Sequence, residues 1–279
     1  MSTSDYCFDT ERVPDFAALC ERFKGKTLRS PYRSTVPLLS LVEHSAHQWH
    51  ALLKSWGAPA DATIHFEYCV PSAKPGSNPS QTDVMLTSDF TVWAVEAKWT
   101  ESRYETVAKR LTKQPRYKTI AEGLSRREAD LVDAKVTVKG WLQHLNRFAT
   151  HSLQLEDVSD VVYQVLHRAA SACAVATEHG RVPHLIYLHF HPSPLKSSAT
   201  TKQYFSDLGD LHVLLGSPTD LKFAVVEVPI QPTKAFESIK DLDKSLPATS
   251  ERVTEALRQG GLFIFGTPIT MRIGDSAGS

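Results

Sequence analysis

The sequence has no excess of either charge and lacks several features that mark common protein classes. Lysine plus arginine and aspartate plus glutamate both number 31, so the global charge does not indicate a polyanionic partner. The four cysteines are scattered without a CxxC pair, which argues against zinc and favours a reduced, cytoplasmic protein. No apolar run approaches the roughly 20 residues of a membrane span, and the first residues lack the basic and apolar regions of a secretory signal. We expect no membrane association.

The chain is long and apolar enough to bury a substantial core, with 279 residues of which 42% are hydrophobic. The apolar pattern predicts helices over 34–57 (ended by Gly57), 101–127 (with a break at Pro115), within 128–150, and over 158–180. It predicts strands over 63–70, in two segments of 82–99, and over 184–191, 211–215, 222–230 and 261–273. Residues 1–33 are predicted to be an irregular or short-helical lead-in. This order indicates an α/β or α+β domain with a central mixed sheet.

Three charged residues interrupt the two apolar strands of TDVMLTSDFTVWAVEAKW. They are Asp83, Glu96 and Lys98. Side chains alternate along a strand, so Glu96 and Lys98 share one face. A turn at 89–90 would place Asp83 opposite Glu96, and a turn at 88–89 would place it diagonal to Glu96. Both registers keep the three charged groups on one face.

This arrangement suits metal-assisted hydrolysis of a phosphodiester. Two carboxylates about 5–7 Å apart on a partly buried sheet repel each other and lose hydration. A shared divalent cation removes that cost, and oxygen ligands favour Mg²⁺ or Mn²⁺. A nearby lysine can orient or deprotonate a metal-bound water, or balance charge in the transition state. The alternative is a buried salt-bridge network without catalysis, although buried ion pairs seldom improve on apolar packing.

The spacing of these residues resembles a known motif. Asp83, twelve intervening residues and then Glu96-Ala97-Lys98 in an apolar strand are similar to the PD-(D/E)xK nuclease superfamily, which has the restriction-endonuclease-like fold. Thr82 replaces the usual proline. The resemblance covers roughly residues 35–190, and the sequence is most similar to a group of candidate bacterial restriction endonucleases. It implies an α/β core with a helix, a hairpin that carries the catalytic residues, a helix, and a further strand and helix.

The resemblance also implies a cofactor and roles for individual residues. Mg²⁺, with Mn²⁺ as a substitute, would be held by Asp83, Glu96 and the backbone carbonyl of Ala97. Lys98 would activate or position the attacking water.

Further implied residues lie on either side of the hairpin. An auxiliary acid is expected on the preceding helix, where Glu43 is favoured and Glu67, on the adjacent strand, is the rival. Gln164 and Arg168 in YQVLHRAASACA match a glutamine and a basic residue that follow the catalytic strand in many members. Gln164 would help to position the metal, the lysine or the scissile phosphate.

Basic residues follow the hairpin. The candidates for nucleic-acid binding are Lys109, Arg110, Lys113 and Arg116, together with Arg168. A charge run is most often a solvated helix face, but phosphate contacts need Lys or Arg near the cleaved bond. A second basic cluster over 22–33 allows the same two interpretations. The strand histidines His184, His189 and His191 are interpreted as ordinary residues rather than a metal site.

The sequence therefore predicts one elaborated nuclease domain over 1–279. Its core would cover about 35–190, with the lead-in over 1–33 and a strand-rich C-terminal part over 184–273. The expected activity is Mg²⁺-dependent hydrolysis of DNA, and a role in restriction or phage defence rests on resemblance alone. The alternatives are a catalytically inactive nucleic-acid-binding or assembly subunit, and a hydrolase of another phosphate ester. DNA is the expected partner; a homodimer, other defence-system subunits, endonuclease or exonuclease action and substrate specificity stay open.

Overall fold

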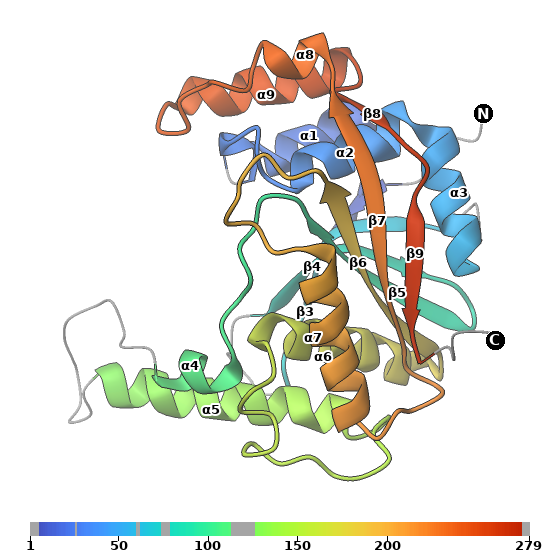
Figure 1. Ribbon diagram of the computed structural model, residues 1–279, viewed down its shortest axis with the longest axis vertical. Coiled ribbons are helices and arrows are strands. Elements are labelled where there is room, and N and C mark those ends of the chain that lie inside the picture. The colour runs from blue at the N-terminus through green and yellow to red at the C-terminus, as the bar shows by residue number, and fades with distance from the viewer. Residues whose placement is uncertain (1–5, 26, 60–61, 74–78, 113–125, 275–279) are drawn as a thin grey trace.

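The computed structural model describes residues 6–25, 27–59, 62–73, 79–112 and 126–274. Within these residues, nine strands form one mixed sheet. They are β1 (Tyr6–Phe8), β2 (Glu11–Val13), β3 (Ile64–Val70), β4 (Ser80–Thr87), β5 (Thr91–Lys98), β6 (Val182–His191), β7 (Lys222–Pro232), β8 (Phe263–Phe265) and β9 (Ile269–Ile273). Helices flank the sheet (Figure 1), so the expected α/β architecture with a central mixed sheet is confirmed.

Helical segments lie between and before the strands. Those described are α1 (Phe16–Phe23), the 3-10 helix η1 (Thr27–Arg29), α2 (Thr35–His44), α3 (Ala46–Trp56), α4 (Val107–Thr112), α5 (Arg126–Leu145), α6 (Tyr163–His179), α7 (Thr201–Leu214), α8 (Lys234–Glu237) and α9 (Pro247–Gln259). Helices α1, α2, α8 and α9 gather at one end of the molecule, and α4 and α5 lie at the other (Figure 1). Among the described helices, none combines the length and apolar character needed to cross a membrane.

The sheet combines antiparallel and parallel pairing. Its order is β2-β1-β3-β4-β5-β6-β7-β8, and β9 pairs with β7 beside this path. β3, β4 and β5 are antiparallel neighbours, whereas β5, β6 and β7 run parallel. Because parallel strands end at the same edge of a sheet, residues near the carboxyl ends of β5, β6 and β7 lie side by side.

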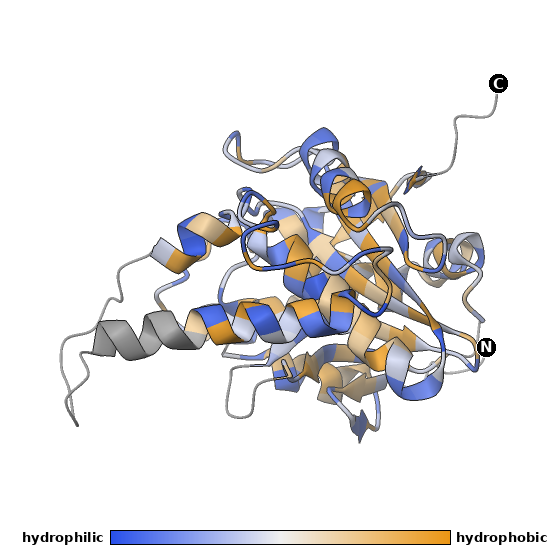
Figure 2. Ribbon diagram, turned by 90° about the horizontal axis from the view of Figure 1, so that it is seen from below, coloured by the Kyte–Doolittle hydropathy of each residue, from blue (hydrophilic) through white to orange (hydrophobic). Residues whose placement is uncertain are grey.

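Side-chain alternation in β5 separates two buried cores. Val95 and Ala97 belong to a core shared with α1, α2, α3 and α9. Ala94 belongs to the other core, which β5 forms with α5, α6 and α7. Hydrophobic residues are concentrated in the strands between these layers (Figure 2). Glu96 and Lys98 follow the parity of Ala94 and therefore face α6.

One predicted strand is a helix. The strand predicted over 211–215 is wrong, because these residues lie at the end of α7. A capping box starts that helix: the hydroxyl of Thr200 accepts from the backbone N–H of Gln203, and the Gln203 side chain accepts from the backbone N–H of Thr200. Leu208 and Leu211, three residues apart, are fully buried. The pattern of a short apolar run does not separate a buried helix from a strand.

Two predicted helices differ from the observed ones. The helix predicted over 34–57 is divided into α2 and α3 at Ser45, whose φ of −136° and ψ of 47° are not helical. Its predicted end is confirmed, since Gly57 closes α3 with a left-handed φ of 74°. The helix predicted over 101–127 is observed in part. Residues 101–105 are not helical, α4 covers 107–112, and 113–125 lie outside the described residues.

Both ends of the chain join the central sheet. The predicted irregular lead-in contains β1 and β2, and β1 pairs in parallel with β3. Three-residue strands are too short to show a periodic pattern. The segment predicted as a strand over 261–273 forms β8 and β9, which pair with β7. The expected C-terminal strand additions are therefore confirmed.

Replacing Gly57 with alanine is expected to lower the free energy of unfolding by about 1 kcal/mol, because an L-residue is strained at its positive φ. Gly209→Ala in α7 is the matched control. A Cβ at Gly209 meets no atom within 4 Å, so alanine should raise the free energy of unfolding by about 0.5–1 kcal/mol. Urea denaturation measures both values, and changes of the same sign would contradict this account.

Candidate functional site

The β4–β5 hairpin adopts one of the two expected registers. Val84 pairs with Val95, and the backbone N–H of Ser88 donates to the carbonyl of Thr91 (2.9 Å), which places the turn at residues 89–90. This register puts Asp83 across from Glu96. The paired backbone ladder stops before these two residues.

The Asp83 side chain takes over the bonding where the backbone ladder stops. Its Oδ2 accepts a hydrogen bond from the backbone N–H of Ala97 at 2.8 Å. The hairpin therefore fixes the aspartate against β5 through one carboxylate oxygen. The other oxygen has no hydrogen-bond donor within the described part of the chain.

Glu96 is the centre of a buried network on the α6 face. Its Oε1 accepts from Nζ of Lys98 and from Nε2 of Gln164, each at 2.8 Å. Its Oε2 accepts from Nε of Arg168 at 2.5 Å. Glu96 and Lys98 are only 2% and 3% exposed. The structure thus brings together four of the residues selected from the sequence, two from β5 and two from α6.

Arg168 also connects α6 to the start of β4. Its Nη1 donates to Oγ of Ser80 at 2.5 Å, and that hydroxyl lies 2.9 Å from Nδ1 of His167. Burial, together with the neighbouring Arg168 and Lys98 cations, holds the pKa of His167 well below its usual value. His167 is therefore neutral and can share a hydrogen bond with Ser80. Sequence reasoning did not select Ser80 or His167.

The two carboxylates have opposite electrostatic environments. Burial would raise the pKa of Glu96, but Arg168 and Lys98 outweigh it and hold that pKa below its usual value. Burial, Glu96 and Glu67 together raise the pKa of Asp83 well above its usual value. Lys98 and Arg168 oppose the rise in the pKa of Asp83 without overcoming it, so the ionised form of Glu96 is favoured and that of Asp83 is disfavoured.

Glu67, rather than Glu43, lies beside Asp83. Phe66 pairs with Val84 and Tyr68 with Thr82, so Glu67 on β3 lies directly opposite Asp83 on the adjacent strand β4. Its backbone has a φ of 51°, which is uncommon for a residue other than glycine. The position of this acid explains why it raises the pKa of Asp83.

The prediction that Glu43 belongs to the site needs correction. Glu43 is near the end of α2, and its Oε2 accepts from the hydroxyl of Tyr6 at 2.9 Å. Tyr6 belongs to the core on the α2 face of the sheet, and Glu43 is bonded to it there. Lys98 and Glu96 are on the opposite face, toward α6. A position on the preceding helix does not reveal which face of the sheet that helix covers.

The donor set allows a metal ion with few protein ligands. Within the described residues, no group of three or more His, Cys, Asp and Glu side chains could enclose a metal ion. A carboxylate offers about four acceptor positions, and three on Glu96 are occupied, which leaves one on Oε2. Asp83 retains its second oxygen. Ala97 contacts Asp83 through its N–H, and the role of its carbonyl as a ligand stays a prediction.

The basic residues chosen for nucleic-acid binding are not all in one place. Lys109 and Arg110 are exposed on α4, and Nη1 of Arg110 lies 3.5 Å from Oε1 of Glu105. Arg168 is buried in the network around Glu96. The two other candidates, Lys113 and Arg116, lie outside the described residues.

A cleft of about 870 Å³ begins directly after β5. Its charged side chains are four basic residues, Arg29, Arg33, Lys240 and Lys244, and three acidic ones, Glu101, Asp241 and Asp243. Thr100 and Glu101 line it, and the same loop carries Tyr104, whose ring centroid lies 5.4 Å from Nζ of Lys98. The loop thus connects the cleft with the buried lysine. The sequence indicated the basic cluster over 22–33 but gave no sign that 240–244 would face it.

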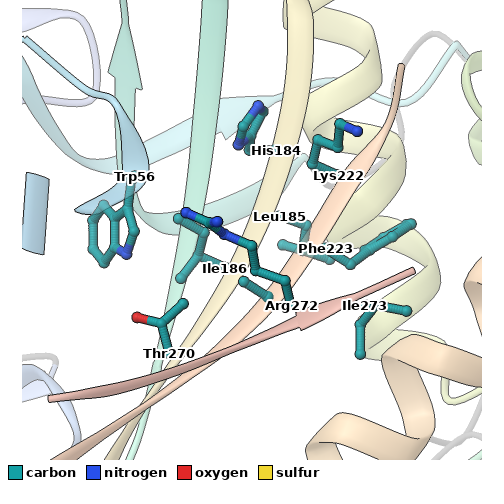
Figure 3. Close-up of a pocket in the computed structure, with 10 residues that line it drawn as sticks. Trp56, His184, Leu185, Ile186, Lys222, Phe223, Thr270, Arg272 and Ile273 are labelled. Carbon is teal, nitrogen blue, oxygen red and sulfur yellow. The ribbon is translucent and has the colours of Figure 1, made fainter. Parts of the chain in front are cut away.

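A smaller pocket lies near the opposite ends of the parallel strands. It has a volume of about 240 Å³ and is lined by Trp56, His184, Lys222 and Arg272, among others (Figure 3). His184 and Lys222 stand near the starts of β6 and β7, whereas Lys98 ends β5. This pocket contains none of the site residues selected from the sequence.

Residues 14–235 match a family described as Domain of unknown function (DUF6946), and the chain belongs to this family. The matched range includes Asp83, Glu96, Lys98, Gln164 and Arg168. No curated protein and no solved structure matches the chain.

Opposite effects on stability are expected when the two carboxylates are neutralised. Glu96→Gln should lower the free energy of unfolding by about 3–5 kcal/mol at pH 8, because it leaves Lys98 and Arg168 buried without their counter-charge. Asp83→Asn should raise it, because the ionised aspartate is disfavoured by burial and by its acidic neighbours.

The pH dependence tests the cause. A raised pKa in the folded state means that wild-type stability falls as pH rises above the usual value of 3.8, so the advantage of Asp83→Asn should grow from pH 4 to pH 8. Denaturation curves at both pH values measure this, with Asp89→Asn in the exposed turn as the control. An advantage that does not change with pH would contradict the assignment.

Proposed function

We propose that this member of the DUF6946 family is a metal-dependent nuclease of the cytoplasm with a restriction-endonuclease-like core, which hydrolyses phosphodiester bonds in DNA. One observation carries the proposal. Asp83, Glu96 and Lys98 converge on one face of a hairpin, and the ionised form of Asp83 is disfavoured although Lys98 and Arg168 act on it. A carboxyl group with a strongly raised pKa in a cluster of ionisable residues is typical of functional sites.

The order of elements supports the same proposal. The PD-(D/E)xK resemblance implies a helix, a catalytic hairpin, a helix, and a further strand and helix. Here α2 and α3 precede the β4–β5 hairpin, α6 follows it, and β6 and α7 come next. Helices α4 and α5 are an addition between the hairpin and α6. The hairpin residues and the α6 residues meet at Glu96, which is where such a core needs them.

The carboxylates suit Mg²⁺ or Mn²⁺. Asp83 would be the principal ligand, because its second oxygen has no hydrogen-bond donor among the described residues and a cation would stabilise its disfavoured ionised form. Glu96 would add the remaining acceptor position of Oε2. When bound, the cation would neutralise phosphate charge and lower the pKa of a coordinated water.

Lys98 would act as a cation in this site. Burial lowers its pKa, but Glu96 and Asp83 outweigh burial and raise the pKa above its usual value. The ammonium form is therefore favoured in the metal-free site. Lys98 would hold the phosphate or the attacking water and offset negative charge in the transition state. Gln164 would fix the orientation of Glu96.

The exposed cations of the cleft after β5 offer a path for the substrate backbone. Arg29, Arg33 and Lys244 are exposed side chains that line it, and the cleft reaches the loop beside Lys98. A phosphate backbone is attracted to such cations and releases counterions when it binds. The cleft would therefore guide DNA toward the hairpin.

A second candidate function follows from the completeness of the Glu96 network. Lys98, Gln164 and Arg168 already bind this carboxylate, so the same site could stabilise the fold of a nucleic-acid-binding or assembly subunit that has no turnover. Such a protein would bind DNA in the cleft without a divalent cation. Titration calorimetry with Mg²⁺ and Mn²⁺ separates the two functions.

Asp83→Asn is expected to reduce Mg²⁺-dependent DNA cleavage at least about 10³-fold, because it removes the uncompensated ligand charge. The assay uses supercoiled, linear and single-stranded DNA and RNA with Mg²⁺ or Mn²⁺. Asp89→Asn in the same hairpin is the control and should keep wild-type activity. If the wild-type protein cleaves none of these substrates, the nuclease proposal is wrong and the binding function is retained.

Replacing Arg29, Arg33 and Lys244 together with alanine is expected to weaken DNA binding and its salt dependence. Each lost phosphate contact should reduce the slope of log K against log salt by about 0.9, hence by about 2–3 for the triple variant. Fluorescence anisotropy at several salt concentrations measures the slope. Lys54→Ala with Lys222→Ala is the control, because Lys54 is on α3 and Lys222 lines the pocket of Figure 3. An unchanged slope in the triple variant would exclude the cleft as the binding path.

A further inference from the structure

Lys98 is the first of three polar residues that cross the parallel part of the sheet. In the strand register, Lys98 of β5 pairs with His189 of β6, and His189 pairs with Glu227 of β7. Partners in parallel strands point to the same face. The three residues therefore form a row on the face of the candidate site, at the carboxyl end of β5, near that of β6 and in the middle of β7.

His189 is held by a threonine at the start of α7. Oγ1 of Thr201 donates to Oε2 of Glu227, and it lies 2.7 Å from Nδ1 of His189. A hydroxyl has one hydrogen to donate, so the threonine that donates to the carboxylate must accept from the histidine. Nδ1 of His189 therefore carries the proton, and Nε2 presents a lone pair.

Two buried polar atoms beside this row have no protein partner. Within the described residues, Nε2 of His189 and the hydroxyl of Tyr187 both lack a hydrogen bond, although these side chains are only 2% and 1% exposed. Both rings pack on Tyr204, with centroid distances of 5.3 Å and 5.4 Å. Nζ of Lys98 lies 5.9 Å from the Tyr187 ring centroid. Buried polar atoms are nearly always bonded, so two such atoms next to Lys98 point to a ligand.

The direction of the histidine ring supports this interpretation. The two ring nitrogens point to opposite sides of the imidazole, so Nε2 faces away from Thr201 and Glu227. β6 lies between β5 and β7, so Lys98 and Glu227 are the neighbours of His189 on its two sides in the sheet.

Burial and the neighbouring His191 lower the pKa of His189 to about 4, against the opposing effect of Glu227 and Glu101. The imidazole is therefore neutral at pH 7, as an acceptor must be.

We propose that His189 is an acceptor residue of the candidate site, held in its Nδ1–H form by Thr201 and Glu227, and that its Nε2 contacts the water or phosphate oxygen of a bound phosphate ester. The proposal deepens the nuclease function and rests on it. In hydrolysis, Nε2 would take a proton from water while the water oxygen forms its bond to phosphorus and the ester P–O bond breaks. The leaving oxygen would be protonated by solvent, and the imidazolium would return its proton to solvent.

The first test is independent of activity. ¹⁵N NMR of the histidine rings should show His189 as the Nδ1–H tautomer, with the signal assigned by its loss in His189→Gln. Thr201→Val, which removes the hydroxyl at similar volume, should abolish that tautomer preference. Adding a DNA duplex with Ca²⁺ should shift Nε2 of His189 and leave His184, at the other end of β6, unchanged. An Nε2–H tautomer, or no shift at saturating DNA, would overturn the proposal.

The second test measures catalysis. His189→Gln should lower kcat by about 10²–10⁴-fold with little change in KM, and Thr201→Val should lower it less. His184→Gln is the control and should keep wild-type kcat. An unchanged kcat in His189→Gln would refute proton transfer by this residue. A wild-type protein that cleaves nothing refutes the nuclease function, and the NMR shift then decides separately whether Nε2 faces the ligand.

Discussion

The carboxylate of Glu96 accepts hydrogen bonds from Lys98, Gln164 and Arg168 while almost entirely removed from solvent. A buried charge of this kind is tolerated only when its counter-charges and hydrogen bonds are all in place. Two of the donors come from α6, so the network fixes how this helix lies on the sheet. The position of α6 in turn fixes Ser80 at the start of β4 through Arg168. The geometry of the candidate site thus depends on one acid.

Asp83 shows the contrasting solution on the neighbouring strand. It is held by a single backbone N–H, and burial, Glu96 and Glu67 disfavour its ionised form more than Lys98 and Arg168 favour it, which costs stability at neutral pH. Strained or uncompensated groups of this kind are typical of functional sites, where stability is given up for chemistry. The balanced Glu96 and the unbalanced Asp83 therefore have different tasks. One maintains the structure and the other is available to a ligand.

The sequence predicted the parts of the site that depend on strand parity. The face shared by Asp83, Glu96 and Lys98 follows from a period of two, and either turn register would preserve it. The resemblance implied that Gln164 positions the metal, the lysine or the scissile phosphate, and its hydrogen bond to Glu96 became visible only with the packing of α6. The row through His189 and Glu227 was missed, because pairing between strands far apart in sequence leaves no local signal. Glu43 was assigned to the site because the sequence does not show which face of the sheet α2 covers.

The fold was predictable where patterns were long and ambiguous where they were short. Strands such as β6 and β7 were identified from extended apolar runs, whereas the five apolar residues at 211–215 suited a strand or a helix equally well. The capping box at Thr200 was a local signal that could have decided the matter. The three-residue strands at the N-terminus offered no such signal.

The two hydrophobic cores draw their buried residues from different lengths of the chain. The fully buried members of the core under α6 lie between Val70 and Val225, whereas those under α2 extend from Tyr6 to Phe265. The backbone N–H of Gly25 donates to Ser250, and that of Leu262 donates to Ser40, each across more than 200 residues. During synthesis, the half of the molecule that carries the ion-pair network can pack first. The apolar surface of the amino-terminal helices then stays uncovered until residues up to Phe265 have been synthesised.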